Sequence, residues 1–146
     1  MKWFRAILIG STICVLSLFW VFPQPFHIAY AKYFAFIKVS TNLYSSRELS
    51  EKKTRQLEKY RTLASERISD FWGSKKGKAA IFYCSEITVY QRLCQSPKGS
   101  GCSVITPFGS WIILNYSGMN EDVIAHEMCH DELATRMGSV SYTHLA

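Results

Sequence analysis

The residues of this sequence that are best suited to chemistry are two histidines and a glutamate in one short stretch, His126, Glu127 and His130. They form the pattern H-E-x-x-H within Asn120 to Gly138, NEDVIAHEMCHDELATRMG, which we expect to be a helix. Residues four apart lie on one helix face, so both imidazoles can meet at one metal ion with Glu127 beside them. Imidazole nitrogens suit Zn2+, which makes a bound water acidic near neutral pH. Glu127 is the expected general base, and the chemistry is metal-assisted hydrolysis of a peptide bond.

The ends of this helix are well marked. Asn120 is a good N-cap, and Glu121 and Asp122 fall in the first turn, where the helix dipole favours carboxylates. Arg136 falls in the last turn, and Gly138 suits the position after it. The alternative is an amphipathic helix whose two histidines are surface or hydrogen-bonded residues without a metal.

The neighbours of the pattern have two interpretations each. Catalytic zinc sites use three protein ligands, and this pattern supplies two. Cys129 is either a soft metal ligand or a small buried residue of the helix. Asp131 and Glu132 either orient a histidine or are exposed helix charges. His144 is either a substitute ligand or part of a loose chain end.

The N-terminus carries a membrane signal. Lys2 and Arg5 precede an uncharged apolar run, Ala6 to Phe22. An uncleaved anchor is the interpretation that we favour, because the run is closer to the roughly 20 residues of a spanning helix than to a secretory signal. A cleaved signal peptide is the alternative, since Ala29 to Ala31 has the small-x-small form of a cleavage site.

The next stretch, residues 26–45, is aromatic and apolar. As a helix it would place two lysines on its polar side, so it either lies on the membrane surface or packs against the domain. The residues concerned are Tyr30, Tyr33, Phe34, Phe36 and Ile37, with Lys32 and Lys38.

Cysteine spacing bears on the compartment. Cys84, Cys94 and Cys102 lie close together in the sequence, and a local disulfide among them would suit an oxidising environment. Three unpaired thiols are the alternative, and the pairing cannot be read from sequence.

Much of the positive charge lies on one predicted helix, Ser46 to Trp72, with Ser45 or Ser46 as its cap. Basic and acidic residues alternate along it, which is typical of a solvated face with ion pairs rather than of nucleic-acid binding. The net charge of +6 would instead favour anionic lipid or acidic partners.

The remaining segments predict an α+β fold. Ala79 to Cys84 is expected to be a buried strand and Ser85 to Cys94 a short helix. Cys102 to Thr106 and Trp111 to Leu114 are expected to form a β-hairpin that leads into the H-E-x-x-H helix. Helices and strands in this order indicate a small sheet with segregated helices.

The stretch TPFGSWIILNYSGMNEDVIAHEMCH, in about the last third of the chain, resembles the entry to the active-site helix of gluzincin-type zinc peptidases. The resemblance implies a zincin-like N-terminal lobe, Zn2+ bound by His126 and His130, and a peptide or protein substrate. It also implies that an edge strand before the helix pairs with the substrate backbone, and the expected strand is Trp111, Ile112, Ile113 and Leu114.

The sequence departs from this family at the third ligand. The family takes it from a glutamate on a later helix, typically some twenty residues beyond the second histidine. Leu133 and Arg136 exclude the pattern in which a glycine and a third histidine follow. The final residues SVSYTHLA resemble a translated adapter sequence, so we expect the natural chain to continue past Gly138 and to supply the glutamate there.

Four regions are therefore expected. They are a signal anchor or transmembrane segment (residues 1–25), a juxtamembrane aromatic segment (26–45), an incomplete zincin-like domain (46–138) and a non-native or disordered tail (139–146). The expected protein is a membrane-associated, extracytoplasmic zinc metallopeptidase on the periplasmic or cell-surface side. The alternatives are a membrane-tethered binding or scaffold domain without catalysis, and a binder of nucleic acid or lipid headgroups driven by charge.

Overall fold

The structure is a computed structural model, and it describes residues 2–21, 23–96, 98–106, 109–138 and 143–144. The elements are, in chain order, α1 (Lys2–Val21), α2 (Pro23–Tyr30), η1 (Ala31–Ala35), β1 (Ile37–Ser40), β2 (Leu43–Ser45), α3 (Glu51–Trp72), β3 (Ala80–Tyr83), α4 (Ile87–Cys94), β4 (Gly101–Thr106), β5 (Gly109–Leu114), η2 (Tyr116–Gly118), α5 (Glu121–Met137) and β6 (Thr143–His144). The fold is mixed α+β, as the sequence predicts.

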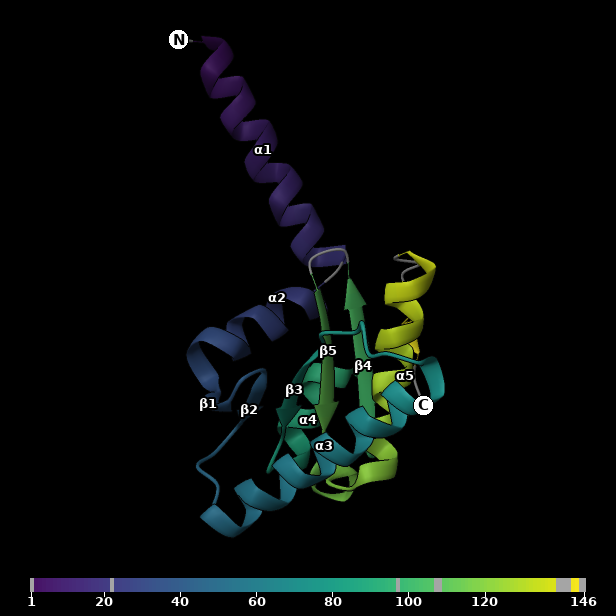
Figure 1. The fold of residues 1–146 in the computed structure, drawn as a ribbon. Coiled ribbons are helices and arrows are strands. Elements are labelled where there is room, and N and C mark those ends of the chain that lie inside the picture. Colours follow the sequence, from purple (N-terminus) through teal and green to yellow (C-terminus); the bar gives the residue numbers. More distant parts are fainter. Residues whose placement is uncertain (1, 22, 97, 107–108, 139–142, 145–146) are drawn as a thin grey trace.

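Helix α1 projects away from the rest of the molecule (Figure 1). Among the described residues it is the one helix long and apolar enough to cross a membrane, and none of its apolar stretch, Trp3–Val21, is buried. An N-terminal apolar helix is therefore confirmed. A membrane span and a signal sequence both fit its length and composition.

The sheet has the strand order β1-β2-β3-β5-β4-β6. Strands β2, β3 and β5 run parallel to one another, while β4 pairs antiparallel with β5 in the predicted hairpin. The turn residues Pro107 and Phe108 lie outside the described residues. Strand β4 lies between β5 and β6, and α5 packs on it.

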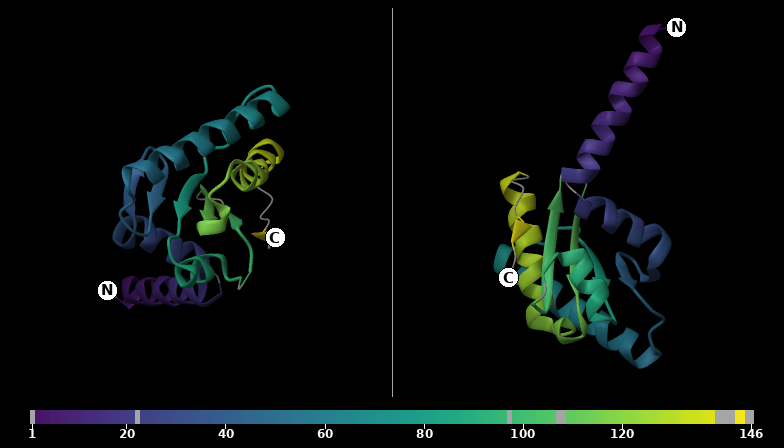
Figure 2. Two further views of the ribbon diagram at one scale, coloured as in Figure 1. Left: turned by 90° about the horizontal axis from the view of Figure 1, so that it is seen from below. Right: turned by 180° about the vertical axis from the view of Figure 1, so that it is seen from behind.

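Helices cover both faces of this sheet (Figure 2). One core cluster contains Ile28 of α2, Tyr90 of α4 and Phe82 of β3. The other core cluster contains Leu57 of α3, Met128 of α5 and side chains from the opposite face of the same strands. Helices α3 and α5 therefore pack side by side on one face, and α2 and α4 lie on the other.

Residues 37–45 form the β1–β2 hairpin and not the helix considered for this stretch. Asn42 adopts a positive φ of 57° in the tight turn, a conformation that asparagine tolerates better than most residues. Strand β2 then pairs parallel with β3, from Leu43 opposite Ile81 to Ser45 opposite Tyr83. The stretch expected to lie outside the domain therefore contributes a strand to its sheet.

The long charged helix starts later than the sequence suggested. Its N-cap is Ser50, whose side chain accepts a hydrogen bond from the Lys53 N–H, and not Ser45 or Ser46. Residues Leu57, Ala64 and Ile68 form its buried stripe, while its charges lie on the outer side. The mixed-charge pattern is thus a solvated face, as expected.

Asp131 and Glu132 are not exposed helix charges. Both are buried, and both accept backbone N–H groups from the segment that leads into β3. Glu132 accepts from Lys76 and Gly77, and Asp131 Oδ2 accepts from the Ala79 N–H at 2.9 Å. These carboxylates therefore hold the start of β3 against the C-terminal half of α5.

Arg136 completes this cluster, and we expect Arg136→Ala to lower the free energy of unfolding by about 2 kcal/mol. Its Nε lies 2.7 Å from Glu132 Oε1, and the two side chains are 22% and 0% exposed. Arg55→Ala is the matched control, because it breaks another i,i+4 pair whose side chains are 69% and 81% exposed. We expect the control to change stability by less than about 0.5 kcal/mol. Denaturant unfolding of the full chain in detergent measures both, and equal losses would contradict the expectation.

The stability should also depend on pH through Glu132. Burial raises the pKa of Glu132, but hydrogen bonds from the Gly77 and Lys76 N–H groups and from Arg136 outweigh it, so the pKa lies below the ordinary 4.5. A lowered folded-state pKa stabilises the protein above pH 4.5, and this contribution is lost as the pH falls through the folded-state pKa. We expect the stability gap between the parent and Glu132→Gln to narrow steadily below that pH in unfolding curves. A gap that stays constant down to pH 3 would show that ionisation of Glu132 does not matter.

Candidate metal centre

The predicted helix around the H-E-x-x-H pattern is present, with its expected ends. Asn120 is the N-cap, and its side chain accepts from the Val123 N–H at 3.0 Å. Gly138 follows the last turn with a φ of 69°, a conformation that most side chains disfavour. These two residues fix where α5 begins and ends, and so fix the position of the histidines on it.

The two histidines converge. The Nε2 atoms of His126 and His130 lie 3.2 Å apart, and the ring centroids are 4.8 Å apart. Two nitrogens bound to one zinc at 2.0–2.1 Å with tetrahedral angles would stand about 3.3 Å apart. His126 is exposed and His130 half-buried, so an ion could reach both from solvent. The pair therefore fits two positions of a zinc site, and the same distance also suits a hydrogen bond between the rings.

Glu127 lies between α5 and β4 and is 3% exposed. The hydroxyl of Ser103 on β4 lies 2.6 Å from Glu127 Oε2 and 3.1 Å from the Glu127 carbonyl oxygen. A Cβ on Gly101 would stand only 2.9 Å from Val123 Cγ1 and 3.1 Å from Glu127 Cγ, so this close approach requires glycine there. Glu127 and His126 both border one hollow of about 400 Å3 beside Gly101.

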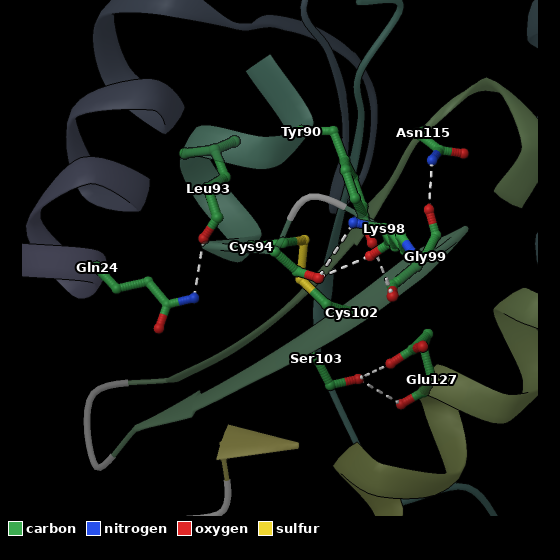
Figure 3. The surroundings of a disulfide bond; sticks show 12 residues. Gln24, Tyr90, Leu93, Cys94, Lys98, Gly99, Cys102, Ser103, Asn115 and Glu127 are labelled. Atoms are coloured by element: carbon green, nitrogen blue, oxygen red, sulfur yellow. Dashed lines mark hydrogen bonds between the residues drawn. A yellow bond between two sulfur atoms is a disulfide. The ribbon is translucent and has the colours of Figure 1, made fainter. Parts of the chain in front are cut away.

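Helix α4 also holds strand β4, through a disulfide and a hydrogen bond. Cys94 at the end of α4 forms a disulfide with Cys102, with their Cα atoms 6.0 Å apart. The hydroxyl of Tyr90 donates to the Gly101 carbonyl at 3.0 Å, and burial, followed by the charges of Glu127 and Cys84, raises the pKa of Tyr90 to about 12. Figure 3 shows the disulfide beside β4 and Ser103 directed at Glu127. The strand that contacts Glu127 is thus tied to α4.

Cys84 is the third of the clustered cysteines and is not part of the disulfide. Its thiol is free and buried in the same hydrophobic cluster as Cys94 and Cys102. Burial raises the pKa of the Cys84 thiol to about 12. Of the alternatives open from the sequence, a local disulfide is therefore the one that the structure contains.

The expected position of Trp111 to Leu114 at the edge of the sheet is wrong. These residues belong to β5, which is hydrogen-bonded to β3 on one side and β4 on the other. No edge of β5 is open to an added strand, and Ile112, Ile113 and Leu114 are buried in the two cores. Strand β4 is the neighbour that lies on the outer side, and β6 pairs with it antiparallel at Ser103 and Val104. In the described residues, β6 thus occupies the side of β4 that β5 leaves open.

A third ligand is not found among the residues that the structure describes, where no group of three His, Cys, Asp or Glu side chains could hold a metal. Cys129 is half-buried, packs against the α3–α5 core and borders a separate hollow with His126. Asp122 is bound to Arg67 of α3 at 2.7 Å. The backbone of His144 lies opposite Ser103 in β6, and its side chain is outside the described structure.

Comparison of the chain with models of protein families, with curated proteins and with solved structures found no match.

We expect the histidine pair to bind a divalent metal. Titration of the full chain with Co2+ should give visible absorption from nitrogen ligation, and Zn2+ should displace it. His126→Ala and His130→Ala should each abolish the signal, because one imidazole holds the ion too weakly. Cys129→Ser is the matched control on the same helix face, and we expect it to leave the signal unchanged. A signal that survives both histidine variants would place the metal elsewhere.

Proposed function

We propose that this protein is a zinc-dependent metallopeptidase of the gluzincin type, with His126 and His130 as two zinc ligands and Glu127 as general base. The observation that carries the proposal is the 3.2 Å separation of the two Nε2 atoms on an exposed helix face, with Glu127 bordering the same hollow as His126. Zinc, when bound, would polarise a carbonyl and acidify a water. The described residues do not identify the third ligand.

The residues of the chain have separate roles in this proposal. Ser103 holds Glu127 Oε2 by its hydrogen bond, which leaves Oε1 to accept the proton of the attacking water. Gly101 lets the carboxylate approach β4 closely. The disulfide and Tyr90 attach β4, and with it Ser103, to α4. Strand β4 therefore positions the proposed general base, Glu127.

The proposed substrate is an extended peptide that pairs with β4 in place of β6. This strand lies next to α5, and its backbone at Ser103 and Val104 already accepts an antiparallel strand in the form of β6. Main-chain pairing of this kind would bring the scissile bond alongside Glu127 and His126. It would also bind many sequences, because backbone hydrogen bonds do not depend on side chains.

We propose that the domain lies outside the cytoplasm and is attached to a membrane by α1. Helix α1 has the length and composition of a span. The Cys94–Cys102 disulfide supports an oxidising compartment such as the periplasm or cell surface, where such bonds persist.

A non-catalytic, membrane-tethered binding or scaffold domain is the second candidate, and one observation favours it. Glu127 is nearly fully buried and is already engaged by Ser103, as a purely structural glutamate would be. In that case Glu127 would serve to dock α5 on β4 and would need no metal.

We expect the zinc-supplied protein to cleave an internally quenched casein-derived peptide, and Glu127→Gln to lower kcat by about 10²–10⁴-fold. The same variant should still bind Co2+, because the histidines are intact. Glu132→Gln is the matched control, since it makes the same change at another buried glutamate of α5. It should lower stability but leave the rate per folded molecule within a few-fold. Hydrolysis that persists in Glu127→Gln or in excess chelator would overturn the proposal, and Co2+ binding without any hydrolysis would favour the scaffold.

A further inference from the structure

A row of large apolar side chains faces outward on α2, η1 and the start of β1. Phe26, Tyr30 and Phe34 stand four residues apart and thus share one side of the helical segment, and the other two members lie next to them in sequence or just beyond it. Each of them is at least 38% exposed. We call this row the aromatic stripe, and it consists of Phe26, Tyr30, Tyr33, Phe34 and Ile37.

The opposite side of the same segment is fixed to the domain. Ile28 and Ala31 are buried in the core cluster that also contains α4. The Gln24 side chain donates to the Leu93 carbonyl at 2.8 Å, a contact visible in Figure 3. The Phe36 ring packs on Phe82 with centroids 5.1 Å apart. The segment is therefore apolar on both sides. Because one side packs firmly on the domain, loose packing does not explain why the aromatic stripe is exposed.

The stripe begins where α1 ends. The ring of Phe19 near the end of α1 lies 5.3 Å from the ring of Phe26 and 6.4 Å from that of His27. Figure 1 shows that α2 leaves the base of α1 at a steep angle and crosses the domain beside it. A helix that crosses a bilayer along α1 would thus place α2 and the stripe at the level of the lipid headgroups.

Two lysines border the stripe. The Lys32 Nζ lies 5.5 Å from the centroid of the Tyr33 ring and 5.9 Å from that of Tyr44. Lys38 is exposed on β1. Aromatic rings with flanking lysines match the bilayer interface, where rings sit at headgroup depth and cations meet anionic phosphates.

We propose that the aromatic stripe binds the headgroup layer of an anionic lipid bilayer and holds the domain against the membrane at the end of α1. This surface acts in addition to the span and does not depend on the peptidase proposal. It also requires the N-terminal segment to be retained, because cleavage after Ala31 would remove Ile28 from the core.

The test uses the full chain in vesicles of phosphatidylcholine and phosphatidylglycerol. The environment-sensitive dye NBD is attached at Phe34→Cys, in a background of Cys14→Ala and Cys129→Ala, while the buried Cys84 is left in place. Arg55→Cys is the matched control, because Arg55 is exposed on α3 in the half farthest from α1 (Figure 1). Tyr30→Cys provides a second site on the stripe should the first variant fold poorly.

We expect the dye at position 34 to emit at shorter wavelength than at position 55 and to be quenched several-fold more by nitroxide-labelled lipid. Its reduction by dithionite from the aqueous side should be several-fold slower. Equal dithionite rates at the two positions would overturn the proposal. Slow reduction without quenching by the lipid nitroxide would also overturn it, because another copy of the chain would then cover the stripe.

The lysines provide a separate check. Lys32→Gln combined with Lys38→Gln should reduce the lipid quenching at position 34 in the anionic vesicles and leave it unchanged in pure phosphatidylcholine. An equal effect in both lipids would show that the stripe does not select anionic headgroups.

Discussion

The candidate centre depends on how closely α5 approaches β4. Gly101 has no side chain, so Val123 and Glu127 can lie directly on the strand, and Ser103 then reaches the Glu127 carboxylate. This contact sets the rotation of α5 about its axis. With Glu127 directed at the sheet, His126 and His130 turn to the solvent side. The close contact at Gly101 and the exposure of the two histidines thus lie on opposite sides of the same helix.

Contacts elsewhere in the fold hold β4 and α5 in the positions that this contact requires. Behind β4, the disulfide and the Tyr90 hydroxyl tie the strand to α4. At the other end of α5, Asp131 and Glu132 accept backbone N–H groups from the segment before β3. The helix is thus held at two points along its length, by polar contacts whose partners are buried. Charge-assisted hydrogen bonds of this kind fix a geometry more narrowly than apolar packing does.

Local signals explain which parts of the fold could be predicted from sequence. The ends of α5 depend on Asn120 and Gly138, residues whose own chemistry marks a cap and a stop. The β4–β5 hairpin follows from two apolar runs and a short turn, but such a pattern is symmetric and does not say which strand lies inside the sheet. The sequence therefore does not distinguish β5, which lies inside the sheet, from an edge strand. The turn between β1 and β2 depends on the positive φ of Asn42. The aromatic stretch around this residue gives no clear turn signal, so the sequence does not predict these two strands. The backbone N–H groups that Asp131 and Glu132 accept lie more than fifty residues away in sequence, and no local pattern points to them.

The buried Cys84 thiol has a consequence for the covalent stability of the domain. It shares a cluster with the Cys94–Cys102 disulfide, and a thiolate there could attack that bond and exchange partners with it. Because burial raises the pKa of Cys84 to about 12, the thiol is protonated at pH 7. Exchange is correspondingly slow. Burial in the apolar core thus protects the Cys94–Cys102 disulfide from exchange with the free Cys84 thiol of the same cluster.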